Sequence, residues 1–241
     1  MERQMIDIHC HLIPGVDDGA ANMEMAMNML LLSASQGITG IFATPHSSAF
    51  DLYGEEAGEQ LRRLRAQARK LFPDMALYSG CEVYCEGGIM NQILTALEAG
   101  IYPSMNDTKY VLLEFSPWVR AEEAKRCARA LLDHGWSPVI AHMERYGYLR
   151  ELPELAEQFR DMGCLIQINA YSLSDEKDEA IRQWARRLAE RRLADFLGTD
   201  AHRTYHRPPC VSRGLDWLYE HCDQDYADGI AFRNAQRLLI Q

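Results

Sequence analysis

The sequence predicts an α/β protein built as a closed or nearly closed barrel of parallel strands. Three observations favour this fold class. Short β-branched and aromatic runs alternate seven times with segments of helical periodicity, and 241 residues is a usual size for a single β/α barrel domain. No G-x-G-x-x-G follows any run, which disfavours a doubly wound dinucleotide-binding sheet. We therefore expect one domain over residues 1–241.

The expected strands are short apolar runs, as buried parallel strands are. Because a helical segment follows each of them, all should run in the same direction. In chain order they are Gln4–His9, Ile38–Thr44, Ala76–Glu82, Tyr110–Phe115, Pro138–His142, Leu165–Asn169 and Asp195–Thr199.

The expected helices each have one apolar face, the pattern of a helix that covers a sheet. Gly37, Gly135 and Gly163 stand one to three residues before a strand, where a glycine commonly ends the preceding helix. The helices are Met23–Gln36, Glu55–Leu71, Gly88–Glu98, Ala121–His134, Leu152–Met162, Glu176–Arg191, Val211–His221 and Asp225–Leu239.

Residues that can bind metal ions stand at or just after the C-terminal ends of six of these strands. In an α/β barrel these ends converge on one mouth, where active sites lie. A single histidine at a strand end is more often structural, so the inference depends on the joint occurrence. The candidate ligands are His9, His11, Asp18, His46, Glu82, Glu114, His142, Asp200 and His202.

The spacing of His9 and His11 fits a metal site, because residues i and i+2 of a strand point to the same side. Cys10 should then face the opposite side as a packed thiol. Imidazoles together with carboxylates suit zinc, manganese or iron better than magnesium or calcium. Nine candidate ligands exceed the needs of one ion, so we expect two or three ions, with a carboxylate such as Glu82 bridging two of them.

Charge and composition limit the other classes of function. The formal charge of −10 disfavours a general nucleic-acid-binding surface, so local cations must attract an anionic substrate. The apolar runs are too short to span a bilayer, and seven cysteines without a C-x-x-C pair suit reduced thiols. We expect a cytoplasmic protein that is not embedded in a membrane.

Motifs for non-metal phosphate or acyl chemistry are missing from the sequence. There is no G-x-x-x-x-G-K-[ST] loop and no G-x-S-x-G elbow, and no cysteine has an arginine six positions later. These absences disfavour a P-loop NTPase, a serine hydrolase and a cysteine-dependent phosphatase. The chemistry should therefore run through the metal ions.

The motif series resembles the PHP (polymerase and histidinol phosphatase) superfamily over essentially the whole chain. Within it, Met5-Ile-Asp-Ile-His9, His142-x-Glu-Arg145-Tyr146 and Arg207-Pro-Pro209 resemble the bacterial tyrosine-protein phosphatases of capsule and exopolysaccharide loci. The series comprises His9-Cys-His11, Asp17-Asp18-Gly19, Thr44-Pro45-His46, Glu82-Val-Tyr84, Glu114-Phe-Ser116, Ala141-His142-Met-Glu144-Arg145-Tyr146, Gln167-Ile-Asn169 and Asp200-Ala-His202.

The resemblance implies a distorted, TIM-like (β/α)7 barrel of the PHP type with three divalent ions, often manganese, although iron or zinc would fit the same ligands. It implies that Arg145 and Arg207 bind phosphate oxygens and that Asp18 is a ligand, a proton donor or both. The three ligand sets that it implies are His9, His11, Glu82 and Asp200, then Glu82, Glu114 and His142, then His46, His202 and Asp18.

The resemblance also implies the reaction, which is hydrolysis of phosphotyrosine by a metal-activated water. The substrate would be a phosphotyrosine protein, with a polysaccharide-export tyrosine kinase as the expected partner. Two alternatives stay open: a small-molecule phosphatase or phosphodiesterase of the same superfamily, and a degenerate barrel that only binds. No ligand position is lost, which disfavours the second. Ser47-Ser48 replaces the basic residues that many relatives have after His46, so substrate preference is the open question.

Overall fold

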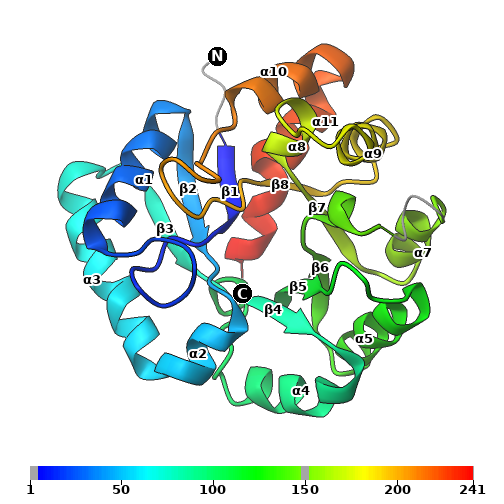
Figure 1. The fold of residues 1–241 in the computed structure, drawn as a ribbon, viewed down its shortest axis with the longest axis horizontal. Helices are drawn as coiled ribbons and strands as arrows, with labels where there is room; N and C mark the ends of the chain where they lie inside the picture. Colours follow the sequence, from blue (N-terminus) through cyan, green and yellow to red (C-terminus); the bar gives the residue numbers. More distant parts are fainter. Residues whose placement is uncertain (1–4, 148–151, 241) are drawn as a thin grey trace.

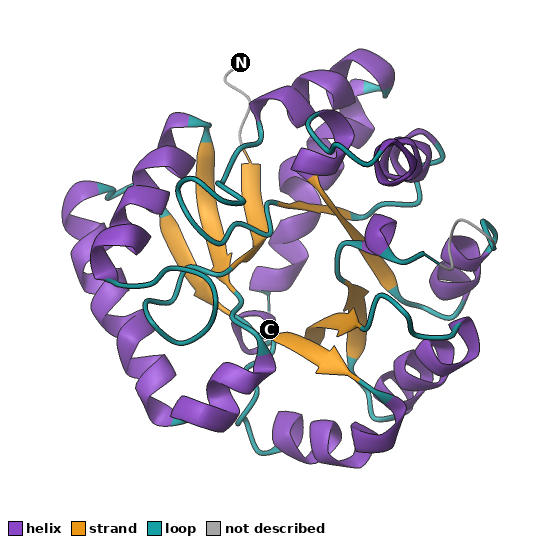
Figure 2. Ribbon diagram, viewed as in Figure 1, coloured by secondary structure: helices purple, strands orange, loops and turns teal. Residues whose placement is uncertain are grey.

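Within the described residues, eight parallel strands surround the centre of the molecule, and helices cover their outer side (Figures 1 and 2). The computed structural model describes residues 5–147 and 152–240. The predicted fold class is confirmed, and every strand pair in this part of the chain is parallel. The strands are β1 (Met5–Cys10), β2 (Ile38–Ala43), β3 (Ala76–Ser79), β4 (Glu82–Cys85), β5 (Tyr110–Phe115), β6 (Ser137–Ile140), β7 (Leu165–Asn169) and β8 (Phe196–Gly198).

The strands form two sheets, β1-β2-β3 and β4-β5-β6-β7-β8, which meet at their C-terminal ends. Isolated bridges join Cys10 to Ala201 and His46 to Glu82. The His11 amide also donates to the Ala201 carbonyl over 2.9 Å. The barrel is therefore closed at the end where the candidate ligands lie.

The predicted third strand, Ala76–Glu82, is in fact two strands, and this expectation was wrong. β3 pairs with β2 and β4 pairs with β5, so the chain passes from one sheet to the other between them. A Cβ atom on Gly80 would lie 2.9 Å from Thr44 Cγ2 and 3.0 Å from Met105 Sδ. Only glycine fits this crossing without displacing its neighbours.

A β-bulge in β1 sets the direction of the two histidines. Three steps along β1 from Asp7 to Cys10 match only two steps along β2, so β1 has one extra residue there. Ile8 packs inside the barrel, whereas Cys10 packs in the cluster between strands and helices. The bulge reverses the strand alternation, and His9 and His11 both turn toward the barrel mouth.

The helices agree with the expected ones to within a few residues, except that α2 and α8 were not predicted. With 7 and 5 residues, α2 and α8 are too short to show helical periodicity in the sequence. No helix in the described ranges is long and apolar enough to cross a membrane. The helices are α1 (Met23–Ser35), α2 (Ser47–Tyr53), α3 (Glu55–Leu71), α4 (Met90–Glu98), α5 (Ala121–Asp133), α7 (Leu155–Asp161), α8 (Ala170–Ser174), α9 (Glu179–Glu190) and α10 (Ser212–His221), with short 3-10 turns η1 (Gly87–Ile89), η2 (Met105–Asp107) and η3 (Met143–Arg145).

The C-terminal segment closes the barrel at the end opposite the candidate ligands. It consists of α11 (Gln224–Asp228), the π-helix η4 (Gly229–Arg233) and the 3-10 helix η5 (Asn234–Leu239), instead of the single regular helix that we expected. Asn234 Nδ2 donates to the carbonyl of Asp195, just before β8 begins. The barrel interior is a separate apolar cluster made of Ile6, Ile8, Phe42, Met105, Leu112, Val139, Ala141, Phe196, Ala235 and Leu238.

Candidate metal centre

All nine candidate ligands lie together at one mouth of the barrel, eight of them at or after the C-terminal ends of strands and Glu82, contrary to expectation, at the first residue of β4. They come from β1 and the loop after it, from the ends of β2, β5 and β6, from the start of β4, and from the loop after β8. Most are buried, and Asp18, with 64% of its side chain exposed, lies at the solvent side of the group. The structure therefore places on one site the residues that the sequence distributes over almost two hundred positions.

The deepest part of the site joins His9, His11, Glu82 and Asp200. The two Nε2 atoms lie 3.3 Å apart, and each is 3.2 Å from an oxygen of Glu82. Asp200 Oδ1 lies 3.6 Å from His9 Nε2 and 3.5 Å from His11 Nε2. Two ligands on one tetrahedral ion with bonds of about 2.1 Å are roughly 3.4 Å apart. These four side chains therefore have the spacing of a shared metal site.

Glu82 also belongs to a second group of ligands, with Glu114, His142 and His46. Its Oε1 lies 2.9 Å from His142 Nε2, and its Oε2 lies 3.0 Å from His46 Nδ1. The Glu114 carboxylate is 3.6 Å from each of these two rings. One carboxylate thus faces ligands on both sides, the position that a bridging ligand occupies.

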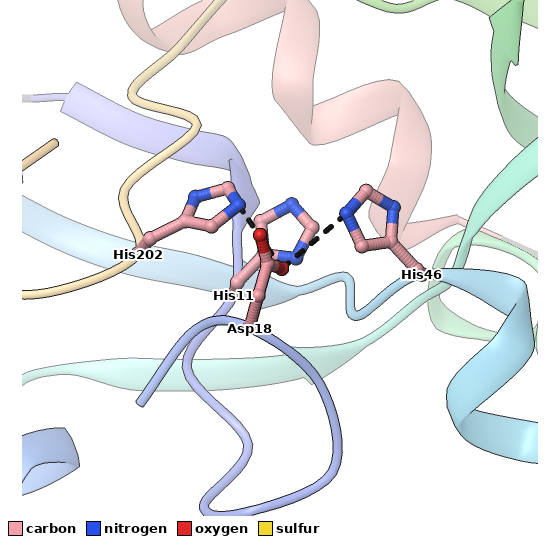
Figure 3. A group of neighbouring side chains, drawn as sticks. All are labelled: His11, Asp18, His46 and His202. Carbon is pink, nitrogen blue, oxygen red and sulfur yellow. Dashed lines mark ion pairs between the residues drawn. The ribbon is translucent and has the colours of Figure 1, made fainter. Parts of the chain in front are cut away.

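A third group lies nearer to solvent and is drawn in Figure 3. Asp18 Oδ1 lies 3.5 Å from His46 Nε2 and 3.4 Å from His202 Nε2, with the His11 ring between these two histidines. Ligand atoms from all four residues lie within 4.8 Å of one another. Asp18 is thus placed to be a ligand and is also open to a substrate.

Charge in the site is arranged for cations. Burial alone would raise the pKa of Glu82 and lower that of His11, yet their mutual interactions prevail: the pKa of Glu82 lies well below its usual range and that of His11 well above. Hydrogen bonds with Glu114 and Glu82 overcome burial at His142 and raise its pKa to about 10. Protons on His11 and His142 therefore help to balance the carboxylates, and metal ions would replace these protons. Glu82 Oε2, which faces the histidines, is buried without a hydrogen bond, so this oxygen fits an atom that binds an ion.

The two arginines that the resemblance implicates both reach Asp200. Arg145 Nη1 donates to Asp200 Oδ2 over 3.0 Å, and Arg207 Nη2 donates to the same oxygen. Arg207 Nη1 also lies 3.1 Å from His202 Nε2. Three residues of the site, His142, Asp200 and Arg207, have positive φ angles of 29°, 53° and 53°. Such strained conformations occur where the surrounding fold fixes functional side chains.

A second layer of polar residues, to which the sequence analysis gave no role, orients the ligands. Asp17 Oδ2 lies 2.7 Å from His11 Nδ1 and accepts from the His46 amide over 3.2 Å. Gln167 Oε1 accepts from the His142 amide over 2.8 Å and lies 3.2 Å from His9 Nδ1. Each contact is made to a backbone amide or to Nδ1 of a histidine whose Nε2 faces the other ligands. Outer partners of metal ligands make contacts of this kind. The available signals were the position of Asp17 next to Asp18 and that of Gln167 within β7, both in the motif series.

Replacement of Asp17 by asparagine should weaken metal binding without unfolding the protein. The variant would lack the carboxylate that keeps the proton of His11 on Nδ1 and leaves Nε2 free to bind a metal ion. Loss of such an outer partner usually lowers metal affinity or activity by about 10- to 100-fold. Titration of the metal-free variant with Mn²⁺ measures this effect. Asp74→Asn, an exposed site in the α3–β3 turn, is the control and should bind Mn²⁺ like the unmodified protein. If Asp17→Asn binds Mn²⁺ as tightly as the unmodified protein, this role of Asp17 is wrong.

A parallel barrel with histidines and carboxylates gathered at its C-terminal strand ends defines the chain as a metal-dependent hydrolase. Its sequence matches the family model described as capsular polysaccharide synthesis, CpsB/CapC, over residues 5–240. The chain belongs to this family, and the resemblance noted in the sequence is confirmed.

Individual relatives support the same assignment. The tyrosine-protein phosphatase CpsB of Streptococcus pneumoniae is 30% identical over 243 residues, which cover 98% of both chains. The tyrosine-protein phosphatase YwqE of Bacillus subtilis (strain 168) is 32% identical over 200 residues, covering 82% of this chain and 77% of YwqE.

Solved structures agree with the fold. A chain from the crystal structures of YwqE and CpsB, described as unique metal-dependent tyrosine phosphatases, matches with a TM-score of 0.83 and 30% identity, over 92% of this chain and 90% of that one. The histidinol phosphate phosphatase of Lactococcus lactis, complexed with zinc, histidinol and phosphate, matches with a TM-score of 0.58 and 14% identity, covering 90% and 94% of the two chains. The second match concerns the fold alone.

Proposed function

We propose that this protein is a metal-dependent protein-tyrosine phosphatase that acts on a phosphotyrosine protein of capsule or exopolysaccharide synthesis, with a polysaccharide-export tyrosine kinase as its partner. The observation that carries the proposal is the shared position of Glu82 between two ligand groups, next to two arginines that converge on Asp200. The whole of residues 1–241 would form one phosphoesterase domain. Its cysteines are all free, as suits a cytoplasmic location.

The site would hold three divalent ions, with manganese favoured over iron or zinc. Glu82 would bridge two of them, and Asp18, His46 and His202 would hold the third. When bound, the ions would offset the negative charge of the phosphate and lower the pKa of a water enough for it to be a nucleophile near neutral pH. The donor set of imidazoles and carboxylates supports these metals over magnesium or calcium.

The protein's own residues would bind and orient the phosphate. Arg145 and Arg207 have planar, permanently charged groups that can each hold two phosphate oxygens. With the ions in place, these guanidinium groups would exchange Asp200 for the substrate. Asp18, exposed at the mouth, would act either as a ligand of the third ion or, in its protonated form, as the acid that protonates the leaving oxygen. Because a phenolate is already a good leaving group, a tyrosine ester needs little of this help.

The substrate assignment is tested by comparing kcat/KM for four kinds of substrate. The purified protein with Mn²⁺ should hydrolyse p-nitrophenyl phosphate and should prefer a phosphotyrosyl peptide to histidinol phosphate and to dinucleotides. A large preference for histidinol phosphate or a dinucleotide would replace the protein-phosphatase assignment with a small-molecule one and leave the metal chemistry intact. No hydrolysis of any of them with Mn²⁺, Fe²⁺ or Zn²⁺ would refute the phosphatase assignment itself.

A further inference from the structure

Trp118 is the most exposed of the large apolar side chains in the described part of the molecule. It lies between β5 and α5, and 89% of its surface is open to solvent. Tryptophan is among the residues most often largely buried, because its side chain has a large apolar surface. A tryptophan held almost wholly in water adds little to the stability of the fold. The stability of the fold therefore does not explain why a tryptophan stands at this position.

The backbone around Trp118 is fixed, so its exposure is not that of a loose chain. The Val119 amide donates to the Ser116 carbonyl over 3.0 Å, which closes a turn around Pro117 and Trp118. The Trp118 amide donates to Ser116 Oγ over 3.3 Å, and Pro117 has a restricted φ angle. Val119 is only 8% exposed and anchors the turn to the core. The turn presents the indole outward from a rigid base.

Trp118 lies at the same end of the barrel as the candidate metal centre. It follows Glu114 by four residues, so the two Cα atoms are at most about 14 Å apart. The β5–α5 loop lies at the C-terminal end of the strands, on the same side as the mouth. A phosphotyrosine bound at the metal centre would bring the neighbouring residues of its polypeptide within reach of this side chain. A small phosphate ester would not extend so far.

We propose that Trp118 is a specificity-determining residue, which contacts an apolar or aromatic side chain next to the phosphotyrosine of a polypeptide substrate. This inference rests on the proposed function. The metal ions and arginines would bind any phosphate monoester alike, so a preference for a polypeptide must come from contacts outside the phosphate site. An exposed indole on a rigid turn provides such a contact with little loss of side-chain freedom.

The test compares two substrates in the full-length protein loaded with Mn²⁺. Trp118→Ala should lower kcat/KM about fivefold for a phosphotyrosyl peptide with apolar residues on both sides of the phosphotyrosine, mainly by raising KM, as expected for loss of one aromatic contact. Its kcat/KM for p-nitrophenyl phosphate should stay within about twofold. Trp118→Phe should recover most of the loss on the peptide. Ile101→Ala, an exposed apolar site after α4 and outside the β5–α5 loop, is the control and should change neither value.

The outcomes separate this inference from the function on which it rests. If the unmodified protein cleaves p-nitrophenyl phosphate but not the peptide, the proposed protein-phosphatase function fails, and the role of Trp118 with it. If it cleaves the peptide and Trp118→Ala leaves the ratio of the two kcat/KM values unchanged, the role of Trp118 alone is refuted. An equal loss on both substrates would also refute it, since that would indicate a structural effect.

Discussion

Replacement of Glu82 by glutamine should lower kcat for p-nitrophenyl phosphate by about a thousandfold or more. Glu82 is 1% exposed and lies within 3.2 Å of ring nitrogens of His9, His11, His46 and His142. The neutral amide has nearly the same size but can neither bridge two cations nor balance their charge. Loss of metal-assisted catalysis removes several kcal/mol of transition-state stabilisation, which corresponds to this factor.

The control for this variant is Glu86→Gln, at an exposed position four residues further along the chain. It removes the same charge from a side chain outside the ligand groups and should leave kcat unchanged. Circular dichroism should show that both variants are folded. Activity of Glu82→Gln within about tenfold of the unmodified protein would mean that Glu82 does not bridge catalytic ions.

Replacement of Arg207 by alanine should lower kcat/KM by about a hundredfold. A donor that is positioned before the reaction and faces developing charge typically contributes a factor of about 10²–10³. Arg207 is held by Asp200 and lies 3.1 Å from His202, so its guanidinium is already placed at the ligands. Arg207→Lys keeps the charge but loses the two-pronged geometry, and should recover less than a tenth of the lost activity.

Arg213→Lys provides the comparison, since Arg213 is 75% exposed and pairs with Asp175 away from the site. It should be fully active. Full activity of Arg207→Lys would indicate that only a nearby positive charge is needed, and full activity of Arg207→Ala would remove this residue from phosphate binding altogether.

Much of the site could be predicted because strand ends in a barrel converge. The positions of His46, Glu114 and His142 at the ends of apolar runs were enough to place them on one mouth. The fold class followed from the same alternation of strands and helices. These features depend on local periodicity, which a single sequence records well.

Other features depend on contacts between distant segments and could not be predicted in this way. The crossing at Gly80 is set by Thr44 and Met105, which lie 36 and 25 positions away from it. The bulge in β1 is defined only by its register with β2. Asp17 had no assigned role in the motif series, and only the folded chain brings its carboxylate to His11. In each case a contact with another segment of the chain, and not the local sequence, decides the structure.

The C-terminal segment shows the same limit in a helix. Its apolar periodicity predicted a regular helix over Asp225–Leu239, but the segment changes from α- to π- to 3-10 geometry as it packs across the end of the barrel. Ala235 and Leu238 join the interior cluster, which requires a path fitted to the barrel. Tertiary packing thus overrides the local preference for an α-helix.

We propose that these nine residues hold three catalytic metal ions, and an anomalous-difference map can locate such ions. Crystals of the protein loaded with Mn²⁺ would be measured on both sides of the manganese absorption edge. We expect three peaks: one among His9, His11, Glu82 and Asp200, one beside Glu82, Glu114 and His142, and one beside Asp18, His46 and His202. An absence of peaks in this region from crystals of active, metal-loaded protein, or peaks bound only by other residues, would contradict it.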